Sequence, residues 1–365
     1  MLYLFSKWLE GWFGPFRLFS SYLVLIGLGT FAAALLTWVL LEKKAFFRHV
    51  PLDRGKKLVD GGYASKGKPT GVGMLLMLFT LPVLALVMPP SLKVWEVIGC
   101  LYAAMVTGFL DDSAHLPWGE FRKGMMDLVI CAACSVALCQ LEPVRMWLPL
   151  VKGTFLVSPW IFIPLSSVVL WLAINATNCS DGVDGLAGTL AMLSLLYLGV
   201  LLYGVVGHKG VSGYLLVTHN PEGAMWALLV FTFAGTLASY LWFNAEPSQL
   251  LMGDAGSRPL GLLMGVAVMA AGNPILILVA APIILINGGA GLVKLVLLRT
   301  FKRMGFETAL DTARHPAKLL HKVRFPLHDH CRKHLHWSNA QVLMRFSLLQ
   351  AMLIPLLLVW LIKLR

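Results

Sequence analysis

Three groups of aspartates stand out because most of this 365-residue chain is apolar: Asp111 with Asp112, Asp181 with Asp184, and Asp254. Only 13% of the residues are charged, so carboxylates at the ends of apolar segments are costly unless a cation or hydrogen bonds compensate them. Adjacent carboxylates repel each other, which raises one pKa or recruits a cation. Mg²⁺ usually binds one or two carboxylates together with substrate phosphates. The pattern predicts a magnesium-dependent enzyme that works at a membrane face.

Membrane-spanning helices must position these side chains. Mean hydropathy is +0.76, and the apolar residues occur in blocks close to the roughly 20 residues that a helix needs to cross a bilayer. We predict ten spans, at residues 21–41, 71–88, 94–110, 125–141, 155–174, 186–206, 224–243, 259–271, 275–298 and 342–362. The predicted fold class is therefore all-α: a polytopic integral membrane protein of about ten transmembrane helices, with one domain over residues 1–365.

Two of these spans are unusual. The eighth is short and could be re-entrant. The ninth contains Pro282 and the segment Asn-Gly-Gly at 287–289, which predicts a broken or kinked helix.

Basic residues set the predicted orientation. The loops after odd-numbered spans, counted together with Arg345 at the start of the tenth span, hold 21 of the 30 Lys and Arg residues, and such an excess marks cytoplasmic loops. Both termini should then lie outside the cell, and all three aspartate groups should meet on the cytoplasmic face. The net charge of +12 also favours anionic membrane lipids as partners, and nothing indicates nucleic-acid binding.

Polar residues concentrate in the loops of that face. The third of them, residues 175–185, reads Asn-Ala-Thr-Asn-Cys-Ser-Asp-Gly-Val-Asp-Gly, a composition typical of a polar turn. Asp181 and Asp184 share a face if the next helix has already begun there. A simple loop with a helix cap explains one of these aspartates, but not the density of polar residues.

Phosphate partners and histidines complete the pattern. Small residues in the segment Gly-Asp-Ala-Gly-Ser at 253–257 let backbone approach a phosphate. Four cations are natural phosphate partners, although each fits a cytoplasmic loop equally well: Lys66, Lys68, Arg122 and Lys123. His328 and His330 suit proton transfer, metal binding or phosphate binding, whereas His334 and His336 fit a solvated basic surface. Together the face favours metal-assisted transfer of a phosphoryl-linked group.

These segments, in this order, resemble the polyprenyl-phosphate N-acetylhexosamine-1-phosphate transferases, and most closely their phospho-N-acetylmuramoyl-pentapeptide branch. The resemblance rests on residues 66–70, 108–112, 175–188, 244, 253–257 and 326–330, and it covers nearly the whole chain. It implies transfer of phospho-N-acetylmuramoyl-pentapeptide from its UDP carrier to undecaprenyl phosphate, with lipid I and UMP as products, in peptidoglycan synthesis. It also implies Mg²⁺ as cofactor, the bacterial inner membrane as location, and a homodimer.

The resemblance also assigns roles residue by residue. It implies that Asp254 is the metal ligand and that Asp111 and Asp112 are the catalytic pair, without deciding which of the two acts as base. It implies a catalytic role for His328. The residues that it places at the substrate are Lys66, Thr70, Lys123, Asn175, Asn178, Asp181, Asp184, Asn244 and His330.

The chain departs from the family pattern at several positions. Asp329 stands in place of the usual middle histidine, and Ser65 replaces a lysine for which the adjacent Lys66 is a candidate substitute. Leu251 replaces an aromatic residue, and Ser113 a tyrosine.

Two other functions stay open. One is a UDP-GlcNAc:polyprenyl-phosphate GlcNAc-1-phosphate transferase for another surface glycan. The other is an ion-coupled transporter that uses intramembrane carboxylates, although transporter sites lie near the membrane midplane rather than at span ends.

Overall fold

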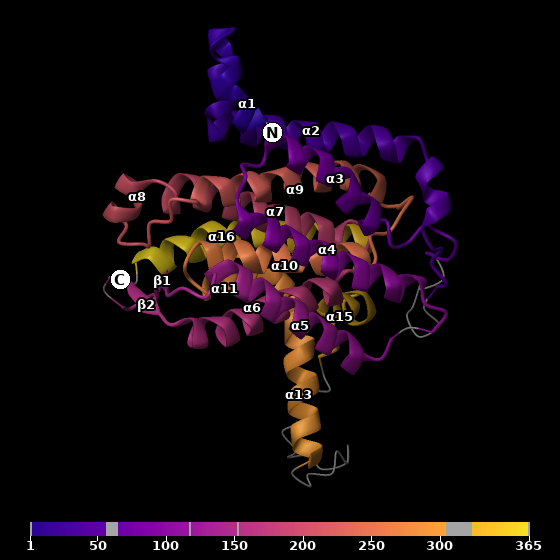
Figure 1. Ribbon diagram of the computed structural model, residues 1–365. Coiled ribbons are helices and arrows are strands. Elements are labelled where there is room, and N and C mark those ends of the chain that lie inside the picture. The colour runs from indigo at the N-terminus through magenta and orange to yellow at the C-terminus, as the bar shows by residue number, and fades with distance from the viewer. Residues whose placement is uncertain (1, 56–64, 117, 152, 304–322, 364–365) are drawn as a thin grey trace.

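The computed structural model describes residues 2–55, 65–116, 118–151, 153–303 and 323–363, which are mostly helical. The long helices pack side by side, α1 stands apart at the top, and α13 projects away below (Figure 1). The elements, in chain order, are α1 (Leu2–Leu9), η1 (Gly14–Ser20), α2 (Tyr22–Glu42), η2 (Ala45–His49), α3 (Gly73–Val87), α4 (Leu92–Ser113), α5 (Glu120–Cys139), β1 (Val144–Met146), β2 (Phe155–Val157), α6 (Pro159–Ser180), α7 (Leu186–Val200), η3 (Leu201–Val206), α8 (Lys209–Tyr214), α9 (Gly223–Asn244), α10 (Asp254–Ala270), α11 (Leu276–Ala280), α12 (Pro282–Ile284), η4 (Leu285–Gly289), α13 (Ala290–Arg303), α15 (Leu327–His334) and α16 (Asn339–Lys363).

The predicted membrane-protein class is confirmed. Seven helical segments of the described chain are long and apolar enough to cross a membrane: α2, α4, α6, α7 with η3, α9, the run Pro282–Thr300, and α16. The remaining predicted spans coincide with α3, α5 and α10. Helices suit this environment because each one satisfies its own backbone hydrogen bonds in the absence of water.

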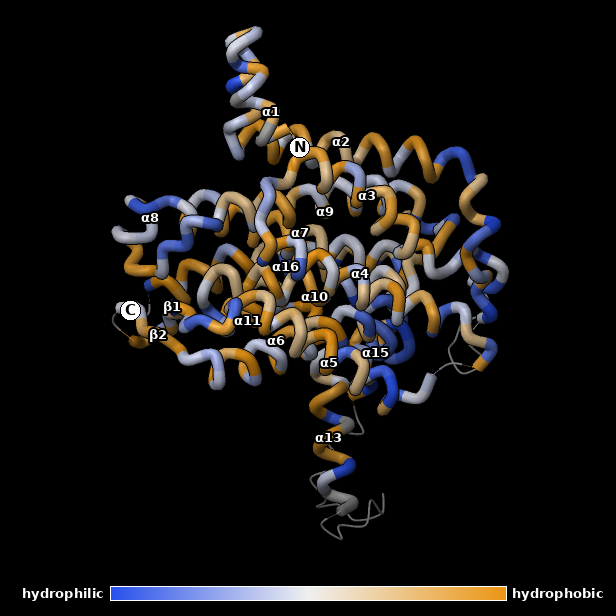
Figure 2. Tube along the Cα trace, viewed as in Figure 1, coloured by the Kyte–Doolittle hydropathy of each residue, from blue (hydrophilic) through white to orange (hydrophobic). Residues whose placement is uncertain are grey.

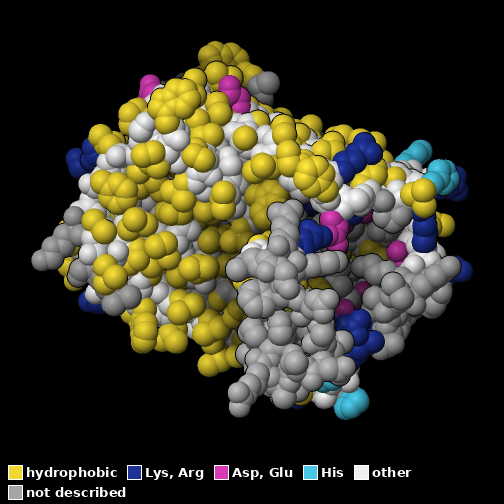
Figure 3. All heavy atoms as spheres, turned by 90° about the horizontal axis from the view of Figure 1, so that it is seen from below, with side chains coloured by type: hydrophobic (Ala, Val, Ile, Leu, Met, Phe, Trp, Pro, Cys, Tyr) yellow, Lys and Arg dark blue, Asp and Glu magenta, His cyan; other side chains and the backbone are white. Residues whose placement is uncertain are grey.

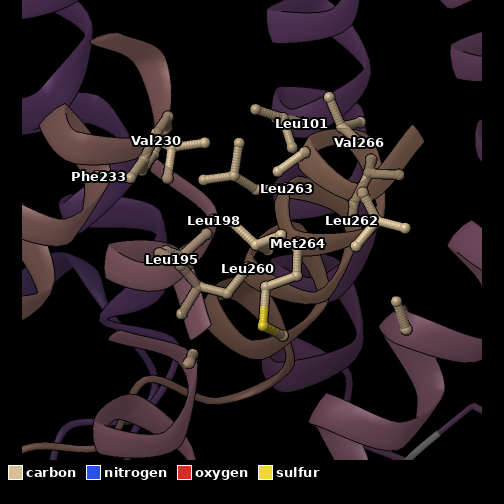
Figure 4. Packing of buried hydrophobic residues seen from close by; sticks show 14 of the residues in the cluster. Leu101, Leu195, Leu198, Val230, Phe233, Leu260, Leu262, Leu263, Met264 and Val266 are labelled. Carbon is tan, nitrogen blue, oxygen red and sulfur yellow. The ribbon is translucent and has the colours of Figure 1, made fainter. Parts of the chain in front are cut away.

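Helix α10 lies at the centre of the hydrophobic core. Every residue from its second to its sixteenth is buried. Its Leu263 and Val266 lie close to Leu101 of α4, and Leu260 and Met264 lie towards the leucines of α7 (Figure 4). A helix buried on all sides has a fixed position, so groups at its two ends are fixed as well.

The two ends of the bundle are polar (Figure 2). We call the end that contains the C-terminus of α4 and the N-terminus of α10 the acidic end, and the other the opposite end. Helix α10 connects them: Asp254 begins it beside Lys123, and Trp147 contacts its last turn. The eighth predicted span is therefore part of one continuous helix, and whether it is re-entrant stays open. The three aspartate groups do share the acidic end; the side of the membrane that this end faces stays a prediction.

The ninth span is broken, as predicted. Helices α11 and α12 lead into the π-helix η4, and α13 continues in a new direction away from the bundle (Figure 1). Gly288 in η4 approaches the backbone oxygen of Ala176 so closely that a Cβ would collide with it. The break thus brings η4 against the last turns of α6.

The third polar loop is shorter than predicted. Helix α6 continues to Ser180, so Asn175 and Asn178 are helical. Helix α7 begins only at Leu186, so the condition under which Asp181 and Asp184 would share a helical face is not met. The start of the fifth span is also wrong, because Phe155–Val157 forms strand β2, which pairs antiparallel with β1.

One basic residue in the orientation count is misplaced. The count treats Arg258 as a loop residue, but it lies in the first turns of α10 with none of its side chain exposed. Several other counted residues lie outside the described residues: Lys56, Lys57, Lys152, Arg314, Lys318, Lys322 and Arg365.

Candidate active site

Glycines allow α10 to begin in contact with α3 and α4. Gly253 precedes α10 with a φ of 65°, and a Cβ there would collide with the carboxylate of Asp112. Gly73, at the start of α3, lies against the backbone of Gly256 with no room for a Cβ. Only glycine combines this conformation with so close an approach. The first turns of α3 and α10 therefore meet at the last turn of α4.

Asp112 holds the N-terminus of α10. Its Oδ1 accepts a hydrogen bond from the backbone N–H of Asp254 at 3.1 Å, and its Oδ2 accepts one from Ala255 at 3.0 Å. A carboxylate at this position satisfies two N–H groups that lack helical partners and faces the positive end of the helix dipole. In this arrangement Asp112 positions Asp254, and its predicted role as a reacting group stays a prediction.

Lys123 lies between Asp111 and Asp254. Its ammonium forms an ion pair with Asp111 and lies 3.2 Å from Oδ2 of Asp254. Asp111 also accepts a hydrogen bond from the backbone of Trp118 at 2.7 Å. Asp111 is buried, whereas 26% of the Lys123 side chain and 19% of Asp254 remain exposed. The structure therefore brings together a cation and two carboxylates at a point that solvent and substrate can reach.

The carboxylates at this point suit Mg²⁺. Within the described residues, no three side chains of His, Cys, Asp or Glu form a ready-made metal cage. Mg²⁺ does not require one, because it usually takes one or two protein carboxylates and completes its shell with phosphates and water. Asp111 and Asp254 meet this need, since their oxygens converge on a single ammonium group.

Asp184 lies in a second polar cluster at the acidic end. Its Oδ2 lies 3.5 Å from the ammonium of Lys68 and accepts a hydrogen bond from the backbone of Ser248 at 3.1 Å. Lys68 also donates to the hydroxyl of Ser248 at 2.8 Å. This cluster joins the loops before α3, after α6 and after α9, and about a fifth of each charged side chain is exposed.

Asn244 makes two hydrogen bonds within the protein, and its predicted contact with substrate stays a prediction. It is buried at the end of α9, where its amide group donates to the carbonyl of Leu250 and its Oδ1 accepts from the backbone of Gly185. The side chain therefore connects the loop after α6 to the loop after α9, the two loops that carry Asp184 and Ser248.

The two asparagines of α6 have different environments. Asn178 accepts a hydrogen bond from the hydroxyl of Ser257 at 3.1 Å, which connects α6 to the first turn of α10. Asn175 donates to the carbonyl of Trp171 one turn earlier on its own helix.

Three further predicted substrate residues lie in the segments that carry Lys68 and Asp184. Asp181 is half-buried where α6 ends. Thr70 is half-buried and is fixed through its backbone N–H, which donates to Pro51 at 2.8 Å. Lys66 is exposed, two residues from Lys68. Lys68, and not Lys66, is thus the cation that the structure places against Asp184.

The two candidate histidines differ in burial. His328 is buried, and both its backbone N–H and its Nδ1 lie within hydrogen-bonding distance of Oδ1 of Asn287 in η4. Its Nε2 lies against Gly182, beside Asp181. His328 is therefore held at the third loop by the break in the ninth span. Asp329 stands in place of the family's usual middle histidine. Its Oδ1 lies 3.8 Å from Nε2 of His328, which is too long for a hydrogen bond.

His330 lies further along α15. Its Nδ1 accepts a hydrogen bond from the backbone of Arg324, and its ring packs against that of His334. Burial, and then the neighbouring His334, lower the pKa of His330, which agrees with a neutral ring that accepts a hydrogen bond. Within the described residues, no hydrogen bond or ion pair joins His330 to the aspartates of the acidic end.

Sequence reasoning did not predict the contacts of four residues at or near the site. Lys68 belonged to the set of phosphate partners, but only the fold distinguishes it from Lys66. Asn287 was recognised as a helix breaker, and its contact with His328 had no sequence signal. The buried pair of Asp127 and Arg258 was also missed.

Figure 3 shows this arrangement on the surface seen from below. Acidic and basic side chains gather toward one edge of that face, next to a broad hydrophobic area. The charged site therefore adjoins the surface that suits lipid.

Comparison with known proteins identifies the family. A model described as glycosyl transferase family 4 matches residues 94–272. The phospho-N-acetylmuramoyl-pentapeptide-transferases of two strains of Treponema pallidum are each 42% identical over 362 residues, which cover 98% of this chain and 95% of the relative. This chain belongs to the phospho-N-acetylmuramoyl-pentapeptide-transferase family.

Membership of this transferase family overturns the transporter alternative. A third phospho-N-acetylmuramoyl-pentapeptide-transferase, from Bartonella quintana, is 26% identical over 266 residues, or 71% of this chain and 69% of the relative. The glycosyl transferase family 4 match runs from α4 to just beyond α10 and so includes Asp111, Asp112 and Asp254. Lys68 and His328 lie outside it, in parts of this transferase that the Treponema relatives also cover.

Proposed function

We propose that this protein transfers phospho-N-acetylmuramoyl-pentapeptide from UDP to undecaprenyl phosphate, with lipid I and UMP as products. A phosphate oxygen of the lipid attacks the phosphorus that carries the sugar, and the bond from that phosphorus to UMP breaks. UMP leaves with the electron pair of that bond. The 42% identity to the named Treponema transferases over nearly the whole chain is the observation that carries this proposal.

The acidic end supplies what such a transfer needs. The diphosphate and the lipid phosphate bring several negative charges together, so cations must offset their repulsion. Lys123 provides one such cation, and its position between Asp111 and Asp254 keeps it directed at one point. Mg²⁺, held by Asp254 with Asp111, would neutralise the remaining phosphate charge when bound. Asp112 fixes the start of α10 and thereby the direction of the Asp254 carboxylate.

The second cluster is proposed to hold the nucleotide. Asp184 belongs to this cluster, the half-buried Asp181 and Thr70 offer further hydrogen-bonding groups, and Asn178 connects α6 to the first turn of α10 through Ser257. Lys68 adds a cation that exchanges its contact with Asp184 for one with the ligand. His328 lies against Gly182, the residue after Asp181, and this position supports the proposal that its imidazole contacts substrate from the side of η4.

The location follows from the same chemistry. The UDP-linked donor is a cytoplasmic metabolite, and the basic loops favour the cytoplasm, so we place the acidic end on the cytoplasmic face of the inner membrane with both termini outside. A homodimer stays part of this proposal.

Release of UMP tests the function. Purified protein is incubated with undecaprenyl phosphate, Mg²⁺ and either UDP-MurNAc-pentapeptide or UDP-GlcNAc. We expect UMP and a lipid-linked muramoyl product from the first donor only. UMP from UDP-GlcNAc alone would show a GlcNAc-1-phosphate transferase, and no UMP from either donor would refute a transferase.

A further inference from the structure

Two pairs of opposite charge connect α5 to α10, one helical turn apart. Lys123 and Asp127 are four residues apart on α5, and Asp254 and Arg258 are four residues apart on α10, so each couple shares one face of its helix. Lys123 lies 3.2 Å from Asp254, and Asp127 forms an ion pair with Arg258. The order of the two signs is therefore reversed from one helix to the other.

The second pair is far more buried than the first. The side chains of Arg258 and Asp127 are 0% and 3% exposed, and Oδ1 of Asp127 accepts hydrogen bonds from Nε, at 3.0 Å, and Nη2 of Arg258. Nη1 of Arg258 is buried without a hydrogen-bond partner in the described part of the chain. A guanidinium group cannot lose its charge in a protein, so this buried cation depends on the Asp127 carboxylate.

The position of Arg258 makes that dependence relevant to the site. Arg258 lies one turn from Asp254 on the same face of α10, and side chains four residues apart on a helix can form ion pairs. We propose that Asp127 is a positioning residue: it holds Arg258 away from Asp254 and so keeps the Asp254 carboxylate available to a divalent cation. This inference rests on the proposed function of Asp254.

The two single substitutions should then differ in their effect on metal binding. Asp127→Asn removes the anion and frees a cation that competes for Asp254. Arg258→Leu removes that cation, and no new competitor appears. A pair with only a structural role gives the same effect from either side, because either change leaves one unpaired group in the core.

Binding of Mn²⁺, followed by electron paramagnetic resonance in detergent, measures this difference. We expect Asp127→Asn to raise the half-saturating Mn²⁺ concentration by roughly tenfold or more, equivalent to about 1.4 kcal/mol. Arg258→Leu should stay within about twofold of the unsubstituted protein, and the double variant Asp127→Asn/Arg258→Leu should return to about that level. The Mg²⁺ concentration that half-saturates UMP release should follow the same order.

Thermal unfolding separates this effect from a loss of stability. Thr80→Val serves as the control because it breaks a buried hydrogen bond of 2.7 Å to Thr236 and changes no charge. It should lower the unfolding temperature and leave Mn²⁺ binding unchanged. If Asp127→Asn does not fold, Arg258→Leu decides alone: unchanged Mn²⁺ binding supports the inference, and a tenfold loss overturns it.

The remaining outcomes are distinct. The inference is overturned if both single variants weaken Mn²⁺ binding equally, or if Asp127→Asn does not weaken it. UMP release by the unsubstituted protein would still support the proposed function in either case. Absence of both UMP release and Mn²⁺ binding in the unsubstituted protein refutes the proposed function itself.

Discussion

The two ends of α10 are closed by different kinds of groups. At the opposite end, Trp147 donates to the carbonyls of Ala271 and Gly272, and Asn220 donates to that of Ala270, at 2.9–3.0 Å. These donors are neutral. At the acidic end, the helix begins on the carboxylate of Asp112.

This difference agrees with the proposal that the acidic end performs the chemistry. Neutral amides and indoles satisfy a helix end at low cost and fix its position. Charged groups that stay partly exposed cost more and can be engaged by a ligand. At the acidic end, Lys123 and Asp254 keep 26% and 19% of their side chains exposed. We therefore propose that the opposite end only fixes the position of α10 and that the acidic end is the reaction site.

Two matched lysines give the largest expected contrast that leaves the aspartates intact. Lys123, at the acidic end, and Lys93, at the opposite end, each contact a carboxylate at 3.0–3.2 Å, and their side chains are 26% and 28% exposed. Lys123→Met should lower the rate of UMP release by roughly 100-fold, because a preorganised charge at the reacting phosphates is lost. Lys93→Met should leave the rate within about twofold. Equal rates for the two variants would remove the distinction between the ends.

Two matched glycines, one at each end of α10, test the difference between the two ends further. Gly253 and Gly272 flank α10 with φ of 65° and 73°. Alanine is strained at both by about 1–2 kcal/mol. At Gly253 its Cβ would also displace Asp112, whereas at Gly272 it would meet the carbonyl of Arg145 at 3.2 Å. Both variants should unfold at lower temperature, but only Gly253→Ala should lose activity beyond its stability, by roughly tenfold or more. Parallel losses of activity would contradict this.

Two neighbouring lysines test the second cluster. Lys68→Met should raise KM for the UDP donor by about tenfold, the value of one charge-assisted hydrogen bond, with kcat changed less. Lys66→Met is the control, because Lys66 is exposed and should leave KM within about twofold. A larger effect of Lys66→Met on KM would show that Lys66, the lysine that the family resemblance places at the substrate, contacts the UDP donor.

The smallest effect concerns the histidines. His336 is exposed beyond the end of α15, so His336→Ala should change UMP release by less than about twofold. A loss comparable to that of His328→Ala, which removes a buried ring held by Asn287, would show that the division among the histidines is wrong.

The positions of most of the spans were predictable because hydropathy over 20 residues depends on the membrane more than on tertiary contacts. The ends of helices were less predictable. Helix α6 continues through its polar segment because Thr177 and Ser180 return hydrogen bonds to carbonyls one turn earlier, and Asn178 finds Ser257 on α10. Local composition alone favoured a turn there.

The aspartates were recognisable from their residue types, but their partners were not. Asp127 and Arg258 are 131 residues apart in sequence, and only the packing of α5 on α10 brings them together. Lys66 and Lys68 differ by two positions, so the direction of one short segment decides which of them reaches Asp184.

The substitution Asp254→Asn tests the central claim most directly, because it keeps the size of the side chain and removes the charge at the acidic end of α10. UMP release and Mn²⁺ binding are measured on the same preparation, with the unfolding temperature as a check of the fold. We predict that release falls by roughly 1000-fold or more and that Mn²⁺ binding is lost in a folded protein. A folded variant that retains both would contradict the account.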